Sequence, residues 1–138
     1  MIRSLSCLLV PALLLAAPPS RSQNPEAVVR RQLEAYNAHD VEAFAAAYSE
    51  DVELYDFPSA LREPKGKAGL KAFYAQRFRD NPNLHADAKD QMLSGPYVIH
   101  REKVTGLADR KDALEVVVVY LVKEGLIRKV WFVRPDKA

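Results

Sequence analysis

The chain has little of several features that would mark particular protein classes. Its 138 residues include one cysteine and five glycines. The cysteine is Cys7, near the N-terminus, so no disulfide can hold the rest of the chain, and that part has to be stabilised by its own hydrophobic core. We find no glycine-rich phosphate loop and no Ser-His-Asp signature. The three histidines, His39, His85 and His100, show no metal-ligand spacing, so we expect neither a metal site nor a cofactor.

The chain also lacks long apolar stretches. The longest, residues 5–17, is too short to span a bilayer, which takes about 20 residues. It follows Arg3 and precedes the small residues Ser20 and Ser22, which is typical of a cleaved signal peptide. We therefore predict a signal peptide over residues 1–22, export to a periplasm or the exterior, and one mature domain over residues 23–138, with no membrane contact after cleavage.

The charge of the predicted mature domain is balanced. Of the 20 basic residues, Arg3 and Arg21 lie in the signal peptide, which leaves 18 to match the 18 acidic ones. No stretch of the mature chain concentrates positive charge. Nucleic acid and acidic membrane surfaces are therefore excluded as expected partners.

What is present is a pattern of helices followed by strands. Asn24 and Pro25 begin a first helix, and Asp40 begins a second one that runs to about Tyr48. Residues 52–57 form a short strand and residues 67–80 a third helix. We predict further strands over residues 84–93, 97–105, 114–122 and 127–133, of which 114–122 is the most strongly apolar. Helices and mostly antiparallel strands in this order indicate the α+β class.

Three motifs resemble those of one superfamily. They are HDVEAF with YSEDVE in residues 39–53, GKAGLKAFY in residues 66–74, and EGLIRKVW in residues 124–131. Together they look like the nuclear transport factor 2-like superfamily, and within it the SnoaL-like and ketosteroid-isomerase-like branch. The resemblance implies a cone of three N-terminal helices packed on a strongly curved sheet, commonly as a dimer. It also implies an apolar cavity for a small hydrophobic or aromatic molecule.

Asp56 is the leading candidate for a catalytic group. It shares a strand face with Val52 and Leu54, and if that face lines an apolar cavity, loss of solvent would make the carboxylate a usable base. The resemblance places the general base of ketosteroid isomerases on this same position. The oxyanion-binding positions of those enzymes fall on Gln32 and Val118, which cannot replace a tyrosine and a protonated acid. We therefore do not expect steroid isomerase activity.

Further candidates complete the predicted site. His100 shares a face with Glu102 and would act with Asp56 if that face is concave; the alternative is a histidine on the solvent side of the sheet. The predicted ligand-binding residues are Gln32, Tyr36, Leu54, Val118, Tyr120 and Trp131. The register of the last strand, and therefore the face of Trp131, is left open. Two functions stay in competition: cofactor-free proton transfer, and ligand binding or dimerisation without catalysis, with a homodimer expected through the outer sheet face.

Overall fold

The structure, a computed structural model, describes residues 24–63 and 65–135. The predicted signal peptide lies outside the described residues. The elements are α1 (Pro25–Asn37), α2 (Val41–Ala46), β1 (Tyr48–Asp56), β2 (Ala60–Leu61), α3 (Gly66–Asp80), β3 (His85–Ser94), β4 (Tyr97–Thr105), β5 (Leu114–Lys123) and β6 (Leu126–Val133). The described strands form one sheet in the order β2-β1-β6-β5-β4-β3. None of the described helices is long and apolar enough to cross a membrane.

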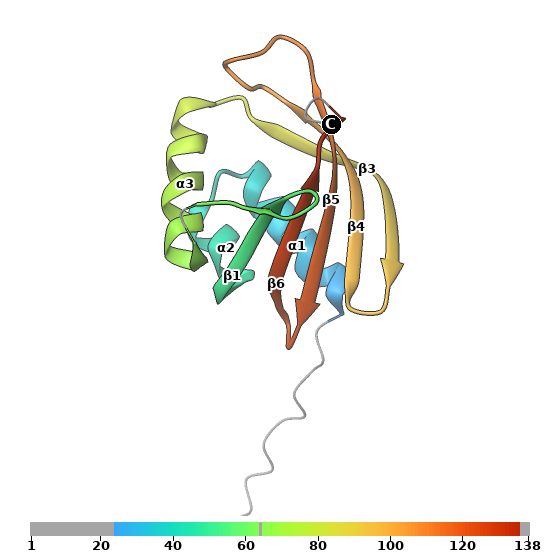
Figure 1. The fold of residues 1–138 in the computed structure, drawn as a ribbon. Helices are drawn as coiled ribbons and strands as arrows, with labels where there is room; N and C mark the ends of the chain where they lie inside the picture. The colour runs from blue at the N-terminus through green and yellow to red at the C-terminus, as the bar shows by residue number, and fades with distance from the viewer. Residues whose placement is uncertain (1–23, 64, 136–138) are drawn as a thin grey trace, which may run out of the picture.

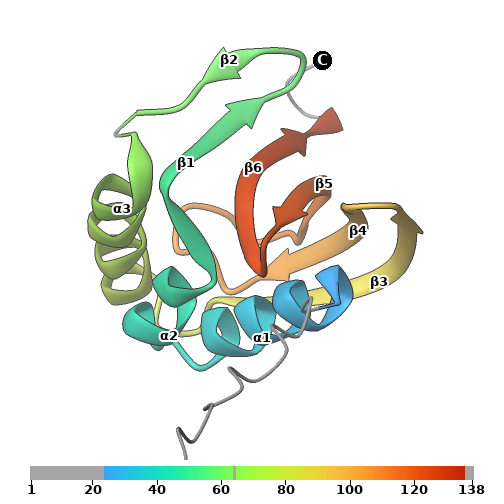
Figure 2. The ribbon, with the colours of Figure 1, turned by 90° about the horizontal axis from the view of Figure 1, so that it is seen from below.

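The sheet curves around the helices. Figure 2 shows it bending from β3, which lies beside α1, round to β1 and β2, with α3 closing the side next to β1. β1 and β6 pair in parallel, and the other pairings of the described strands are antiparallel. The expected α+β class and the mostly antiparallel, curved sheet are therefore confirmed.

The predicted set of three N-terminal helices is confirmed in part. Only α1 and α2 precede the sheet, because β1 and β2 come between α2 and α3 (Figure 1). Since β1 and β6 run parallel, a hairpin cannot connect them, and the chain between them forms β2, α3, β3, β4 and β5. The third helix thus covers the sheet from the side of β1, and does not follow the other two helices directly.

Local sequence signals set the starts of the first two helices. The Asn24 side chain accepts a hydrogen bond from the Glu26 amide at 3.1 Å, and the Asp40 carboxylate accepts one from the Ala43 amide at 3.0 Å. Each satisfies an amide that has no partner within the helix. Both predicted caps are confirmed.

The end of α2 differs from the prediction. The helix stops at Ala46, and Tyr48 already belongs to β1, where it pairs with Ile127 of β6. The Ala47 carbonyl accepts a hydrogen bond from the Ile127 amide at 2.9 Å. Pairing with a distant strand therefore overrides the local helical pattern, and β1 begins four residues before the predicted Val52.

The core lies between α1, α2, α3 and the concave side of the sheet. Phe44 of α2 is fully buried and contacts four aromatic rings from α1, α3 and β1, with centroids 4.5–6.0 Å apart. From the sheet, alternate residues of β4 and β5 face the same interior. They are Val98, His100, Glu102 and Val104 on β4, and Leu114, Val116, Val118, Tyr120 and Val122 on β5. The predicted common face of His100 and Glu102 is confirmed.

Candidate functional site

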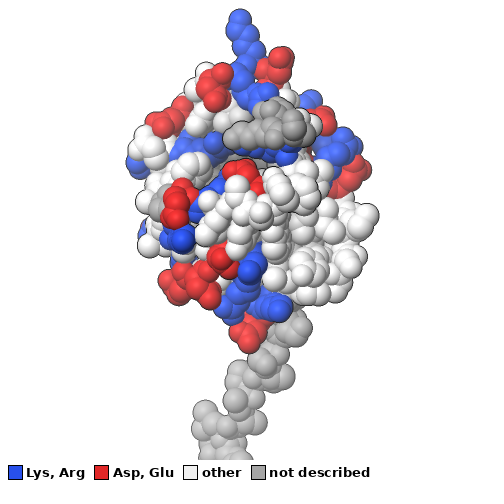
Figure 3. All heavy atoms as spheres, viewed as in Figure 1, with Lys and Arg blue, Asp and Glu red and all other residues white. Residues whose placement is uncertain are grey.

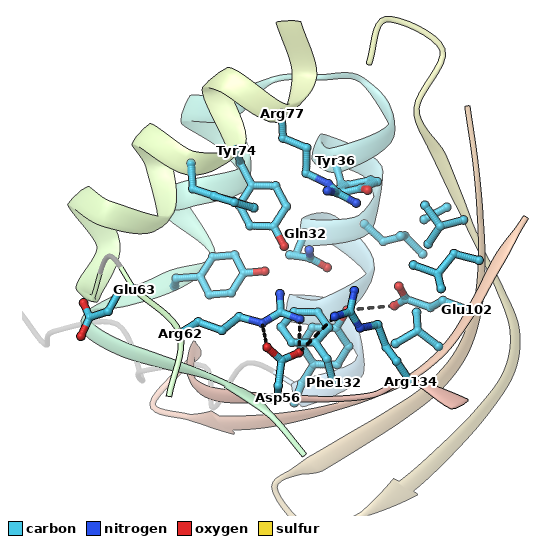
Figure 4. A pocket seen from close by; sticks show the side chains of 18 residues that line it. Gln32, Tyr36, Asp56, Arg62, Glu63, Tyr74, Arg77, Glu102, Phe132 and Arg134 are labelled. Carbon is cyan, nitrogen blue, oxygen red and sulfur yellow. Dashed lines mark hydrogen bonds and ion pairs between the residues drawn. The ribbon is translucent and has the colours of Figure 1, made fainter. Parts of the chain in front are cut away.

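A cavity of about 340 Å³ lies between the helices and the concave side of the sheet. This volume is within the range of small-molecule sites in proteins, roughly 300–1,000 Å³. Its wall includes Gln32, Leu33 and Tyr36 from α1, Phe73, Tyr74 and Arg77 from α3, and residues of β1, β3, β4, β5 and β6. Figure 4 shows charged and aromatic side chains from these elements converging on the same space.

Asp56 lies in this wall, at the end of β1, but its surroundings are not apolar. Its Oδ1 accepts a hydrogen bond from Arg62 Nη2 at 2.6 Å, and its Oδ2 accepts one from Arg62 Nε at 3.1 Å. Arg134 Nη2 is 3.7 Å from Oδ1 (Figure 4). A carboxylate held by two guanidinium groups is stabilised in its charged form. Asp56 therefore belongs to an ion-pair cluster, and the predicted apolar surroundings of its carboxylate are not found.

Arg62 is fixed from a second side. Its guanidinium carbon lies 4.0 Å from the centroid of the Phe132 ring, which also lines the cavity. Such a cation–π contact holds the planar head in place. The Arg62 amide also donates a hydrogen bond to the Leu54 carbonyl at 2.8 Å, so the loop after β2 is anchored to β1.

Glu102 is the second carboxylate of the cavity wall, and it is buried. Its Oε1 accepts a hydrogen bond from the Tyr120 hydroxyl at 2.8 Å and lies 3.3 Å from His100 Nδ1. Both contacts end on the same oxygen, and the carboxylate group lines the cavity. The other ring nitrogen of His100, Nε2, lies 2.9 Å from Gln91 Oε1 on β3.

The structure therefore settles where His100 lies. The side chain is buried, so the alternative of a solvent-facing histidine is wrong. It stands behind Glu102 and is absent from the cavity wall, which excludes direct contact with Asp56 across the cavity. Its neighbours make it a positioning group for Glu102.

Four phenol groups face the cavity, and we call them the cavity tyrosines: Tyr36, Tyr48, Tyr74 and Tyr120. Burial is the main cause that raises the pKa of each above its ordinary value near 10. For Tyr120 the nearby Glu102 charge raises the pKa further. All four therefore stay protonated at neutral pH and can donate hydrogen bonds.

Some of the other predicted ligand-binding residues line the cavity, and some do not. Gln32, Tyr36 and Tyr120 lie in the cavity wall. Leu54 lines a smaller adjoining pocket together with Arg62 and Leu70. Val118 is fully buried and lies outside the wall, because it is covered by neighbouring side chains.

Trp131 needs a correction. It stacks on Tyr55 with ring centroids 5.8 Å apart and an interplanar angle of 14°, and Tyr55 is its partner across β1 and β6. The adjacent Phe132 points into the cavity, so alternation along β6 places Trp131 on the opposite, outer face. A contact with a ligand in the cavity is thus excluded for Trp131.

Sequence reasoning missed the arginines of the site and underrated Glu102. Arg62 and Arg134 follow strands in irregular segments, and Arg77 lies near the end of α3, where no periodic pattern marks it. Glu102 did carry a signal, since a carboxylate that shares one strand face with Val98 and Val104 is buried with them.

Among the described residues, no group of three or more His, Cys, Asp or Glu side chains is arranged to hold a metal ion.

Comparisons with known proteins agree with this architecture. A cystatin-fold protein from Novosphingobium aromaticivorans superposes with a TM-score of 0.74 at 27% identity, over 81% of this chain and 99% of that one. An NTF2-like protein from Cytophaga hutchinsonii has a TM-score of 0.69 at 13% identity, over 85% and 96%. An LEH-like epoxide hydrolase from M. tuberculosis has a TM-score of 0.71 at 13% identity, over 84% and 86%. The last two show likeness of fold alone.

The search of curated proteins gave no match. The model of the SnoaL-like domain family, in contrast, matches residues 29–130, which is most of the chain and contains nearly all of the cavity wall. This chain belongs to the family of SnoaL-like domains.

Proposed function

We propose that this domain binds a small, largely apolar molecule in its cavity and catalyses a cofactor-free proton transfer on it, with Glu102 as the base. The reaction would be of the isomerase, cyclase, dehydratase or hydrolase type. The structural likeness to an epoxide hydrolase supports a fold that can host such chemistry, and it does not assign the reaction.

The observation that carries this proposal is the setting of Glu102. The carboxylate is buried in the cavity wall, and Tyr120 and His100 hold one of its oxygens. The orientation of the carboxylate in the cavity wall is thereby held in place. A base positioned in this way typically contributes about 10²- to 10⁴-fold to the rate of a proton transfer.

The cavity tyrosines supply what the resemblance to ketosteroid isomerases did not predict. A proton taken from carbon leaves negative charge on a neighbouring oxygen, and protonated phenols can donate hydrogen bonds to it. Tyr36, Tyr48 and Tyr74 come from three different elements and line the same cavity. Hydrogen-bond donors for an oxyanion are therefore at hand, although Gln32 and Val118 occupy the positions that bear them in the isomerases.

Asp56 is the other carboxylate of the cavity wall that could act as the catalytic base. Both of its oxygens accept hydrogen bonds from Arg62, which favours a role in holding Arg62 and Arg134 in the wall. The proposal therefore separates the two carboxylates: Glu102 moves the proton, and Asp56 positions the arginines.

Deuterium exchange tests the proposal without knowledge of the natural substrate. The probe is 2-tetralone, a small bicyclic ketone with acidic α-protons, and proton NMR in D₂O follows their loss. We expect the wild-type protein to accelerate exchange above buffer and Glu102→Gln to reduce this acceleration by about 10²-fold or more. Asp56→Asn should retain most of it. An unchanged exchange rate in Glu102→Gln would remove Glu102 from the mechanism.

A non-catalytic ligand carrier is the second candidate function. The pairing of Asp56 with Arg62 favours it, because that carboxylate is not poised as a free base. This function predicts that 2-tetralone binds without any acceleration of exchange, and that binding persists in Glu102→Gln and Asp56→Asn.

Export through the predicted signal peptide and homodimerisation through the outer sheet face complete the proposal. Figure 3 shows an area without charged residues on the right-hand side of this face. On the outer side of β4, β5 and β6, the apolar residues Ile99, Val117, Val119 and Trp131 are only half-buried. Sedimentation of the mature protein and of Val119→Asp tests the dimer; a wild-type monomer would contradict it.

A further inference from the structure

The charges that surround the cavity do not balance. Three guanidinium groups, those of Arg62, Arg77 and Arg134, lie in the wall, against the two carboxylates Asp56 and Glu102. A third carboxylate, Glu63, is exposed and pairs with Lys65 at 3.4 Å, so it contributes to the rim. With all of these groups ionised, the interior carries one positive charge in excess. Low-dielectric walls strengthen the attraction of such a charge for an anion.

Arg77 is the group that carries this excess. It is half-buried, projects from α3 into the cavity, and lies beside the Tyr36 hydroxyl (Figure 4). No carboxylate among the described residues is within ion-pair distance of it, whereas Arg62 and Arg134 both approach Asp56. Partly burying a guanidinium group without a counterion costs free energy, which a bound anion would recover.

Two further polar atoms of the wall have no partner in the described part of the protein. Arg134 Nε is buried without an acceptor, and Gln32 Oε1 is buried without a donor, in a side chain that is only 4% exposed. Buried polar atoms are nearly always hydrogen-bonded, so atoms of this kind in a cavity wall indicate the groups of a missing ligand. The ligand should offer an acceptor to Arg134 and a donor to Gln32.

We infer that the cavity binds a small apolar carboxylate that also carries a hydroxyl group. The single negative charge neutralises the excess at Arg77, and the planar carboxylate matches the geometry of a guanidinium group. The hydroxyl donates to Gln32 Oε1. A doubly charged phosphate ester would overcompensate the interior, and an uncharged lipophile would leave Arg77 without a counterion. The inference rests on the proposed function for the location of the ligand, and it is independent of the reaction.

Three fluorescent probes of the same ring system test the inference. They are 6-hydroxy-2-naphthoate, its uncharged methyl ester, and 2-naphthoate, which lacks the hydroxyl. Fluorescence titration at pH 7 gives their dissociation constants for the mature protein. We expect the hydroxy acid to bind about tenfold to a hundredfold tighter than its ester, because only the acid can form a charged hydrogen bond with Arg77. It should bind about twofold to tenfold tighter than 2-naphthoate.

Variants locate the two contacts. Arg77→Gln should abolish the advantage of the acid over the ester, and Arg77→Lys should restore part of it. Arg79→Gln is the matched control, because Arg79 is exposed on the same helix and contacts Gln76. It should keep the full advantage. Gln32→Met should remove the advantage of the hydroxy acid over 2-naphthoate. The thermal midpoint of each variant shows that it is folded.

The outcomes separate this inference from the proposed function. Equal binding of acid and ester, or an advantage that survives Arg77→Gln, would overturn the carboxylate inference and leave the cavity as the ligand site. Failure of all three probes to bind the wild-type protein would overturn it as well. If the wild-type protein binds the hydroxy acid as expected and does not accelerate deuterium exchange of 2-tetralone, the proposed reaction is contradicted and the inferred ligand class is supported.

Discussion

Replacing Asp56 by asparagine distinguishes an ion-paired carboxylate from a desolvated base. The side chain accepts hydrogen bonds from Arg62 at 2.6 and 3.1 Å, and Arg134 lies 3.7 Å away. A hydrogen bond to a charged group contributes about 1.5–3 kcal/mol. Because a third of the Asp56 side chain is exposed, solvent screening lowers this value, and asparagine retains one acceptor. We expect Asp56→Asn to lower the free energy of unfolding by about 1–2 kcal/mol.

Urea denaturation at pH 7 measures this change, and a double-mutant cycle assigns it. Arg62→Gln alone and the double variant with Asp56→Asn should reveal a coupling free energy of about 1 kcal/mol. Asp87→Asn is the control, because Asp87 is half-exposed and pairs with Lys89 and His85 at the surface. It should change stability much less.

The opposite result would refute the ion-pair reasoning. A carboxylate that is desolvated in an apolar cavity costs free energy, so its replacement by a neutral amide would leave stability unchanged or raise it. A stabilised Asp56→Asn protein without coupling to Arg62 would therefore return Asp56 to the role of the base.

Three further predictions concern the fold. Gly106 has φ +77°, and a Cβ there would lie 1.9 Å from the Asn83 carbonyl oxygen, whereas a Cβ at Gly95 meets nothing within 4 Å. In urea titrations Gly106→Ala should therefore lose at least about 2 kcal/mol more than Gly95→Ala; equal losses would contradict the close contact. Phe44→Ala should cost about 3–5 kcal/mol in the same assay, and a loss below about 1 kcal/mol would contradict its central packing. Because burial raises the pKa of the cavity tyrosines, the unfolded state releases their protons first, so stability should fall as pH rises above about 10. Their ionisation, followed by absorbance at 295 nm, should coincide with unfolding; four phenols that titrate in the folded protein would contradict this.

Much of the fold could be predicted because its signals are local. Asn24 and Asp40 are caps whose side chains act within three residues, and the alternation along β4 and β5 follows from strand geometry. β3 carries a weaker sequence signal, because it is an edge strand and most of its side chains are exposed. The end of α2 could not be predicted, since it depends on the pairing of Tyr48 with Ile127, 79 positions along the chain.

The site was less predictable for the same reason. Asp56 was placed on the correct face, but its environment depends on Arg62 and Arg134, which arrive from a loop and from the end of the last strand. The pairing of Glu102 with Tyr120 joins two strands whose register only the fold defines. Charge pairing inside a cavity is a property of several segments together, and no single stretch of sequence displays it.

The central claim is that the cavity between the helices and the concave sheet is the ligand site. Nitrogen-edited NMR of the mature protein during titration with 6-hydroxy-2-naphthoate tests it most directly. Signals of the Gln32 side-chain amide and of the Nε–H groups of Arg77 and Arg134 should shift together and saturate, while the Trp131 indole signal stays in place. Shifts confined to Trp131 and the outer strand residues, with the Gln32 amide unmoved, would contradict the claim.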